Sequence, residues 1–153
     1  AEVLPRLSGA DARSAHFIED AAYAVRRELE EEDAALHPWK KTMDDMRSLA
    51  TALEARATDE NSYPNVSFAE LEPLIVPTYL RLMPETDAWG TPFRYVGGGE
   101  QYRFISAGAD RRFEFNSDRL DPNDESRLMN SLDSDIIFQD GDFVQAPEES
   151  AEP

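Results

Sequence analysis

The stretch from residue 83 to residue 110 constrains the fold more than any other part of this chain. Phe93 to Val96 and Tyr102 to Ser106 have the composition of strands, and Gly97-Gly98-Gly99-Glu100 separates them. Glycine takes positive φ values without a steric cost, so these glycines suit a tight turn between antiparallel strands. A glycine-rich loop can also bind phosphate, but neither a helix nor a P-loop lysine follows here. The pattern therefore favours a β-hairpin.

A tight turn precedes the first of these strands. In Asp87-Ala88-Trp89-Gly90-Thr91-Pro92 the aspartate can cap the turn, Gly90 can take a conformation that other residues resist, and Pro92 fixes the entry into the strand. Trp89 can be interpreted as an exposed aromatic residue for a partner. The turn chemistry favours a structural role, in which Trp89 packs against a long helix.

Two helices are predicted upstream. Apolar residues recur at spacings of three and four from Asp11 to Leu36, and again from about Trp39 to Ala57. His37-Pro38 separates the two helices, because the residue before a proline disfavours the helical conformation and proline suits a first helical turn. The second helix carries an apolar stripe typical of core packing: Met43, Met46, Leu49, Ala50, Leu53 and Ala57.

Shorter elements complete the predicted fold. Ser67-Phe68-Ala69-Glu70 matches a capping box and predicts a short helix. Ile136-Ile137-Phe138 and Phe143-Val144 predict another strand pair, joined around Asp140-Gly141. The fold class is α+β, with a long N-terminal helix or helices packed on a small antiparallel β-sheet.

Composition limits the size of the protein and the kinds of partner. The 153 residues support one domain with a core, and we divide them into an N-terminal helical extension (1–42), a globular domain (43–146) and a disordered acidic tail (147–153). A net charge of −17 repels nucleic-acid phosphates and anionic lipid headgroups, which argues against a nucleic-acid partner. No run of about 18 apolar residues is present, so nothing in this sequence is expected to span a bilayer. Cysteine is absent, which excludes a disulfide scaffold.

An acidic loop is the candidate metal site. Calcium takes six to eight oxygen ligands, and a flexible acidic loop can supply them. No EF-hand spacing occurs, so a solvated loop without metal is the alternative interpretation. The carboxylates concerned are Asp110, Asp118, Asp121, Asp124, Glu125, Asp133 and Asp135.

Several of these motifs together resemble the C-terminal globular half of the major pseudopilin of type II secretion systems. The resemblance covers about residues 43 to 144, and is carried by Asn61-Ser62-Tyr63-Pro64 at the end of a helix, the Asp87 to Pro92 turn and the Tyr102 to Asp110 stretch. It implies a non-enzymatic structural or assembly subunit of a type II secretion or type IV pilus-like apparatus. The implied partners are other apparatus subunits and, as a further class, secreted cargo. The implied location is the bacterial periplasm or cell envelope, with an inner-membrane anchor in a segment absent from this chain.

The resemblance also implies a calcium site. In the family, a Ser-x-Gly-x-Asp stretch and an Asp-Ile pair flank a short calcium-binding loop. Ser106-Ala107-Gly108-Ala109-Asp110 and Asp133-Ser134-Asp135-Ile136 match these parts, which makes Asp110, Asp133 and Asp135 the candidate ligands. Here 22 residues, Arg111 to Leu132, separate the two parts. This insert is predicted to be partly helical from Asp124 to Leu132. It can replace calcium as the organiser of the loop, with arginines 111, 112, 119 and 127 neutralising the acids.

No catalytic residue is predicted. His16 and His37 lack a spaced set of zinc-ligating partners, and no serine lies in a G-x-S-x-G context. The rival to the assembly subunit is a soluble acidic calcium-binding or cargo-adaptor module that does not polymerise. Residues 1–42 lack the long aliphatic run of a pilin N-terminal helix, which keeps this rival open.

Overall fold

A computed structural model of the protein describes residues 24–25 and 37–152. The chain divides into two compact units, Ala1–His37 and Pro38–Pro153. In the first unit, Ala24 and Val25 are helical, and the rest of the helix predicted from 11 to 36 lies outside the described residues, as does His16. The predicted domain boundary after residue 42 would cut the helix Pro38–Glu60. The division into units falls before Pro38 instead, so this helix belongs wholly to the second unit.

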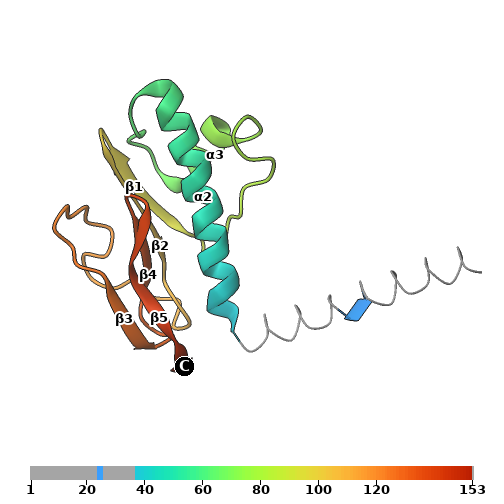
Figure 1. Ribbon diagram of the computed structural model, residues 1–153, viewed down its shortest axis with the longest axis vertical. Helices are drawn as coiled ribbons and strands as arrows, with labels where there is room; N and C mark the ends of the chain where they lie inside the picture. Colours follow the sequence, from blue (N-terminus) through green and yellow to red (C-terminus); the bar gives the residue numbers. More distant parts are fainter. Residues whose placement is uncertain (1–23, 26–36, 153) are drawn as a thin grey trace, which may run out of the picture. The chain divides into compact units, whose positions relative to one another are not determined.

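The second unit is an α+β structure in which a long helix packs against a five-stranded sheet (Figure 1). Strands β1-β2-β4-β5-β3 are neighbours in that order, and all pair antiparallel except β3 and β5, which are parallel. The α+β class is therefore confirmed, while the predicted antiparallel sheet is mixed. The elements are α2 (Pro38–Glu60), α3 (Phe68–Ile75), β1 (Arg94–Gly98), β2 (Gln101–Ser106), β3 (Arg127–Ser131), β4 (Ile136–Gln139) and β5 (Asp142–Glu152).

Two predictions about the C-terminal third were wrong. The segment from 124 to 132 is not helical, because its residues 127–131 form β3 and pair with β5. The residues after 146 are not a disordered tail, since β5 continues to Glu152 and Pro147 is buried opposite Met129 of β3. In both places pairing between distant segments outweighs what local composition favours. The β3–β5 pairing also makes the sheet mixed: β4 lies between these two strands in the chain, so no hairpin joins them and they can run parallel.

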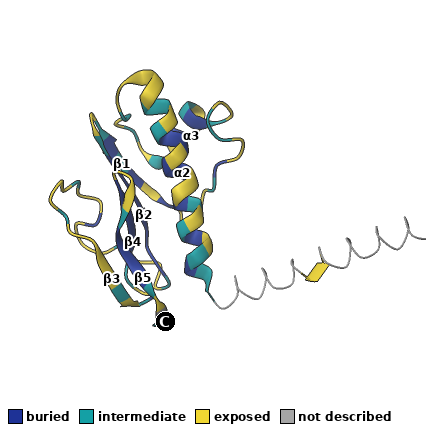
Figure 2. Cartoon of the chain, in the orientation of Figure 1, coloured by how far each residue is buried: buried dark blue, intermediate teal, exposed yellow. Residues whose placement is uncertain are grey.

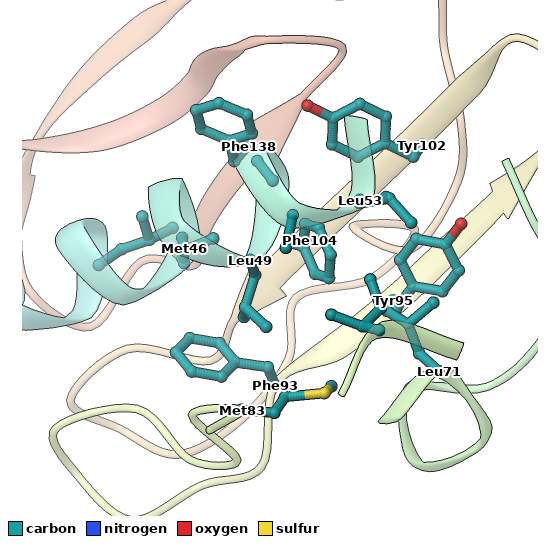
Figure 3. Packing of buried hydrophobic residues seen from close by; sticks show 14 of the residues in the cluster. Met46, Leu49, Leu53, Leu71, Met83, Phe93, Tyr95, Tyr102, Phe104 and Phe138 are labelled. Carbon is teal, nitrogen blue, oxygen red and sulfur yellow. The ribbon is translucent and has the colours of Figure 1, made fainter. Parts of the chain in front are cut away.

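The core lies between α2 and one face of the sheet. Met46, Leu49, Ala50 and Leu53 of the predicted stripe are buried, while Met43 and Ala57 are partly buried. Figure 2 shows the buried residues of α2 on the side that faces the sheet. In Figure 3 the side chains of α2 lie among aromatic rings of the sheet, which form tilted and edge-on pairs of the kind that stabilise cores. The labelled residues of this cluster are Met46, Leu49, Leu53, Leu71, Met83, Phe93, Tyr95, Tyr102, Phe104 and Phe138.

The predicted local motifs are confirmed. Ser67 Oγ accepts from the Glu70 amide and Glu70 Oε1 accepts from the Ser67 amide, each at 3.2 Å, which forms the capping box of α3. Strands β1 and β2 form the hairpin, and Gly99 at its turn has a φ of +62°. Strands β4 and β5 form the other predicted pair.

The second face of the sheet has a smaller apolar cluster. Ile105, Ile137 and Val144 are buried there, and Phe113 of the segment between β2 and β3 packs on them. The Arg94 guanidinium stacks over the Phe113 ring, 3.8 Å from its centroid. Residues 107–126, called the covering segment below, therefore cover the sheet face opposite to α2.

Candidate functional site

Two of the motif parts that carry the family resemblance, the Asp87 turn and the end of the Tyr102 to Asp110 stretch, meet at one end of the sheet. Asp87 Oδ1 accepts hydrogen bonds from the amides of Trp89 and Thr91, each at 3.0 Å. The other carboxylate oxygen, Oδ2, accepts from Ser106 Oγ at 2.7 Å. Gly90 has a φ of +88°. The predicted capped turn is thus confirmed, and its aspartate also binds the end of β2.

The same turn is attached to α2. The Ala88 amide donates to Thr42 Oγ1 at 3.0 Å, and Thr42 is buried. Trp89 is half-buried and packs against the main core cluster, to which α2 contributes. Three segments far apart in the sequence are therefore joined by hydrogen bonds that are largely shielded from water. Such bonds are costly to break, because a buried donor or acceptor is then left unpaired.

Gly108 explains the glycine of the Ser-x-Gly-x-Asp stretch. Its φ is +79°, and a Cβ atom at this position would lie 2.5 Å from the Ser134 carbonyl oxygen and 2.6 Å from that of Leu132. Only glycine fits so close to the backbone at such a φ. The neighbouring Ala109 amide donates to Leu132 O at 2.7 Å. The chain leaving β2 therefore packs directly on the segment that leads into β4.

The three predicted calcium ligands do not form the kind of group that holds a metal ion. Asp110 and Asp133 are exposed, and Asp110 Oδ1 accepts from the Arg112 amide at 2.9 Å. Asp135 is only 1% exposed, and its Oδ2 accepts from the Glu114 amide at 2.9 Å. Its Oδ1 is buried without a hydrogen-bond partner. Within the described part of the chain, no three His, Cys, Asp or Glu side chains are grouped as a metal site requires.

Asp135 is nevertheless chemically unusual. Burial is the main cause that raises the pKa of its carboxyl group to about 6, with smaller contributions from the carboxylates of Glu114 and Asp110, while the Glu114 amide and the Ser117 hydroxyl oppose the change. Of the three predicted ligands, it is the one that combines burial with an unpaired oxygen. A proton or a cation can satisfy that oxygen.

A buried arginine holds the covering segment to the sheet. Arg103 of β2 is 2% exposed, and its guanidinium donates to Gln139 Oε1 at 2.7 Å, to Ser117 O at 2.9 Å and to Asp124 Oδ2 at 2.7 Å. Arg127 donates to the other oxygen of Asp124 at 2.8 Å. Although burial opposes it, these bonds lower the pKa of Asp124. We call this cluster of Arg103, Asp124 and Arg127 the arginine network.

Two buried glutamines extend the attachment. Gln139 Nε2 donates to Asp121 O at 2.7 Å. Gln145 Nε2 donates to Glu114 Oε1 at 3.0 Å and to Asp135 O at 2.7 Å. The covering segment is thereby bonded to β4 through Asp121 and to β5 through Glu114.

The sequence predicted only part of this arrangement. Of the four arginines expected to neutralise acids, Arg127 does so, whereas 111, 112 and 119 are exposed and form no ion pair within the described residues. Arg103 was missed. The alternation of side chains along a strand could have predicted its role, because Arg103 must face the same side of the sheet as Ile105. A cation on an apolar face needs a buried partner of opposite charge or a hydrogen-bond acceptor. His37, the histidine within the described region, is half-buried.

The described helices include none with the length and apolarity needed to cross a bilayer. We also compared the whole chain with protein-family models, with curated proteins and with solved structures, and none of these comparisons found a match.

Proposed function

We propose that this chain is the globular part of a pseudopilin-like structural subunit in a type II secretion or type IV pilus-like apparatus. The observation that carries the proposal is the hydrogen-bonded junction of Thr42, Asp87 and Ser106. Two motif parts that carry the resemblance, the Asp87 turn and the end of β2, are bonded to each other across 19 residues of chain. The same turn also binds Thr42 of the long helix, which lies just outside the range of the resemblance. A shared architecture explains why such dispersed residues occur together.

The subunit acts mechanically. It carries a rigid helix packed on a sheet, and its partners are neighbouring apparatus subunits and secreted cargo in the cell envelope. Helix α2 fixes the orientation of the sheet through a core of large side chains that are fully buried. Protein cores are closely packed and resist compression, so a push along the helix is transmitted to the sheet.

Calcium is the cofactor that the family implies, and the described residues fit it only in part. Asp135 offers a buried free oxygen, while Asp110 and Asp133 are exposed and do not group with it as a metal site requires. The covering segment already has an internal organiser, because Arg103 and Arg127 supply positive charge to Asp124. We therefore assign the organising role to the arginine network, and the proposed function does not depend on calcium.

The coding sequence upstream of Ala1 tests this proposal against the soluble adaptor. An assembly subunit requires a prepilin-type cleavage site followed by about 20 apolar residues, enough to span a bilayer as a helix. A lipoprotein signal or an ordinary secretory signal would instead support an adaptor that does not polymerise.

A further inference from the structure

Strand β3 forms one end of the sheet. Its inner edge pairs with β5, and no strand of the described chain pairs with its outer edge. Figure 2 shows β3 largely in the exposed and intermediate colours, whereas β4, further inside the sheet, is buried. Leu128, at the second position of the strand, is 68% exposed. A row of backbone donors and acceptors with an apolar side chain is thus open to an incoming chain.

The usual protection of an edge strand is weak here. Proteins guard such edges with proline, with lysine or with charges that deter another strand. Residues 127–131 contain neither proline nor lysine. Their one charged side chain, Arg127, donates to Asp124 at 2.8 Å and to Gln145 Oε1 at 2.6 Å. The guanidinium is therefore engaged within the protein, where it holds β3 in place. A short length also protects an edge strand, and β3 has this feature.

The charge around β3 selects the chemistry of a partner. Acidic residues lie two positions before β3, two positions after it, and on β5 beyond Pro147, which pairs with Met129. None of them forms an ion pair within the described part of the protein. They are Glu125, Asp133, Glu148 and Glu149. A second copy of a chain with a net charge of −17 is repelled from this edge, whereas lysine or arginine side chains are attracted to it.

We propose that the outer edge of β3 binds an extended basic segment of a partner protein, which adds a sixth strand to the sheet. Backbone hydrogen bonds to 127–131 provide the pairing, and the surrounding carboxylates bind basic side chains. Leu128 provides the apolar anchor. The inference goes beyond the proposed function, since it says where a subunit or a cargo protein docks, and it holds for an adaptor as well.

A short peptide of alternating lysine and valine is the probe. Amide resonances of the full chain are followed by NMR during titration, and hydrogen exchange of the β3 amides is measured at saturation. A second peptide with the same side chains carries an N-methyl group on every residue, so that neither of its edges can donate the backbone hydrogen bonds of a strand pair. Leu128→Gln removes the apolar anchor without changing charge. Leu82→Gln is the matched control, because Leu82 is also exposed, at 83%, but lies in the segment between α3 and β1.

The proposal predicts binding that slows exchange of β3 amides and fails with the N-methylated peptide. Leu128→Gln should weaken binding about tenfold, as expected for the loss of one apolar contact, and Leu82→Gln should leave it unchanged. Both variants should melt at the temperature of the wild type, because neither side chain is buried. The proposal is overturned if the N-methylated peptide binds equally well, or if Leu82→Gln weakens binding as much. Protection of β3 that rises with protein concentration in the absence of peptide would also overturn it, by assigning the edge to a second copy.

Discussion

Replacing Asp135 by asparagine should stabilise the protein above neutral pH. The wild-type carboxylate is buried with one unpaired oxygen, and its pKa is raised from 3.8 to about 6. A group whose pKa is raised in the folded state favours folding while it is protonated, and this advantage is lost as pH rises through the folded-state pKa. At pH 8 the charged form therefore costs the folded state about 3 kcal/mol. Asparagine keeps the acceptor for the Glu114 amide and carries no charge.

Urea unfolding in EDTA measures this difference. The advantage of Asp135→Asn over the wild type should be about 1.5 kcal/mol at pH 5 and about 3 kcal/mol at pH 8, and should level off above pH 7. Measurements stay at pH 5 or higher, because an acidic chain loses net charge and solubility as its carboxylates are protonated. Asp133→Asn is the matched control, since Asp133 is exposed, and its effect should be within about 0.5 kcal/mol.

Two results would refute the reasoning. One is a variant less stable than the wild type at pH 8 in EDTA, and the other is a difference that does not change between pH 5 and pH 8. Addition of calcium tests whether Asp135 binds a calcium ion. The arginine network predicts equal wild-type stability in calcium and in EDTA. A wild type stabilised by calcium, with no such effect in Asp135→Asn, would place the metal at Asp135.

Three further substitutions test the structure of the domain. Arg103→Met leaves the buried partners of Arg103 unpaired, so it should lower the free energy of unfolding by about 3–5 kcal/mol and speed amide exchange in the covering segment. Arg119 is exposed, so the control Arg119→Met should change the free energy of unfolding by less than about 0.5 kcal/mol. Gly108→Ala meets two carbonyl oxygens at a positive φ and should cost about 2–4 kcal/mol in urea unfolding, against about 1 kcal/mol for Gly90→Ala, which has the positive φ but open space. Ser67→Ala removes half of the capping box and should lower the unfolding free energy by about 1 kcal/mol. Equal effects within either pair, or no effect at Ser67, would contradict the corresponding contacts.

The features that the sequence predicted well depend on partners close along the chain. The capping box joins residues three apart, and the Asp87 turn joins residues two and four apart. The apolar stripe of α2 follows from the helical period alone. Local stereochemistry decides each of these, so the pattern of residue types is sufficient to predict them.

The features that were missed depend on residues far apart. Arg103 and Asp124 are 21 positions apart. The parallel pairing of β3 with β5 makes the sheet mixed and places residues 147–152 in a strand. An acidic stretch was interpreted from its charge as loop or tail, but a strand partner and a buried cation change what that charge can do. The candidate metal site shows the same limit. The sequence identified Asp135 as a candidate calcium ligand. Its burial and its unpaired oxygen follow only from the contacts around it.

Cysteine crosslinking of the full-length protein in its native cell tests the central claim most directly. Residues 1–153 contain no cysteine, so a Ser48→Cys, Ala55→Cys double variant places the only two thiols of this part of the protein on the exposed side of α2, and the parent protein without them is the control. If the protein is a subunit of a pilus-like assembly, oxidation should give a ladder of covalent oligomers beyond the dimer. A monomer band alone, in cells that contain the active apparatus, would contradict the assembly subunit and favour the adaptor.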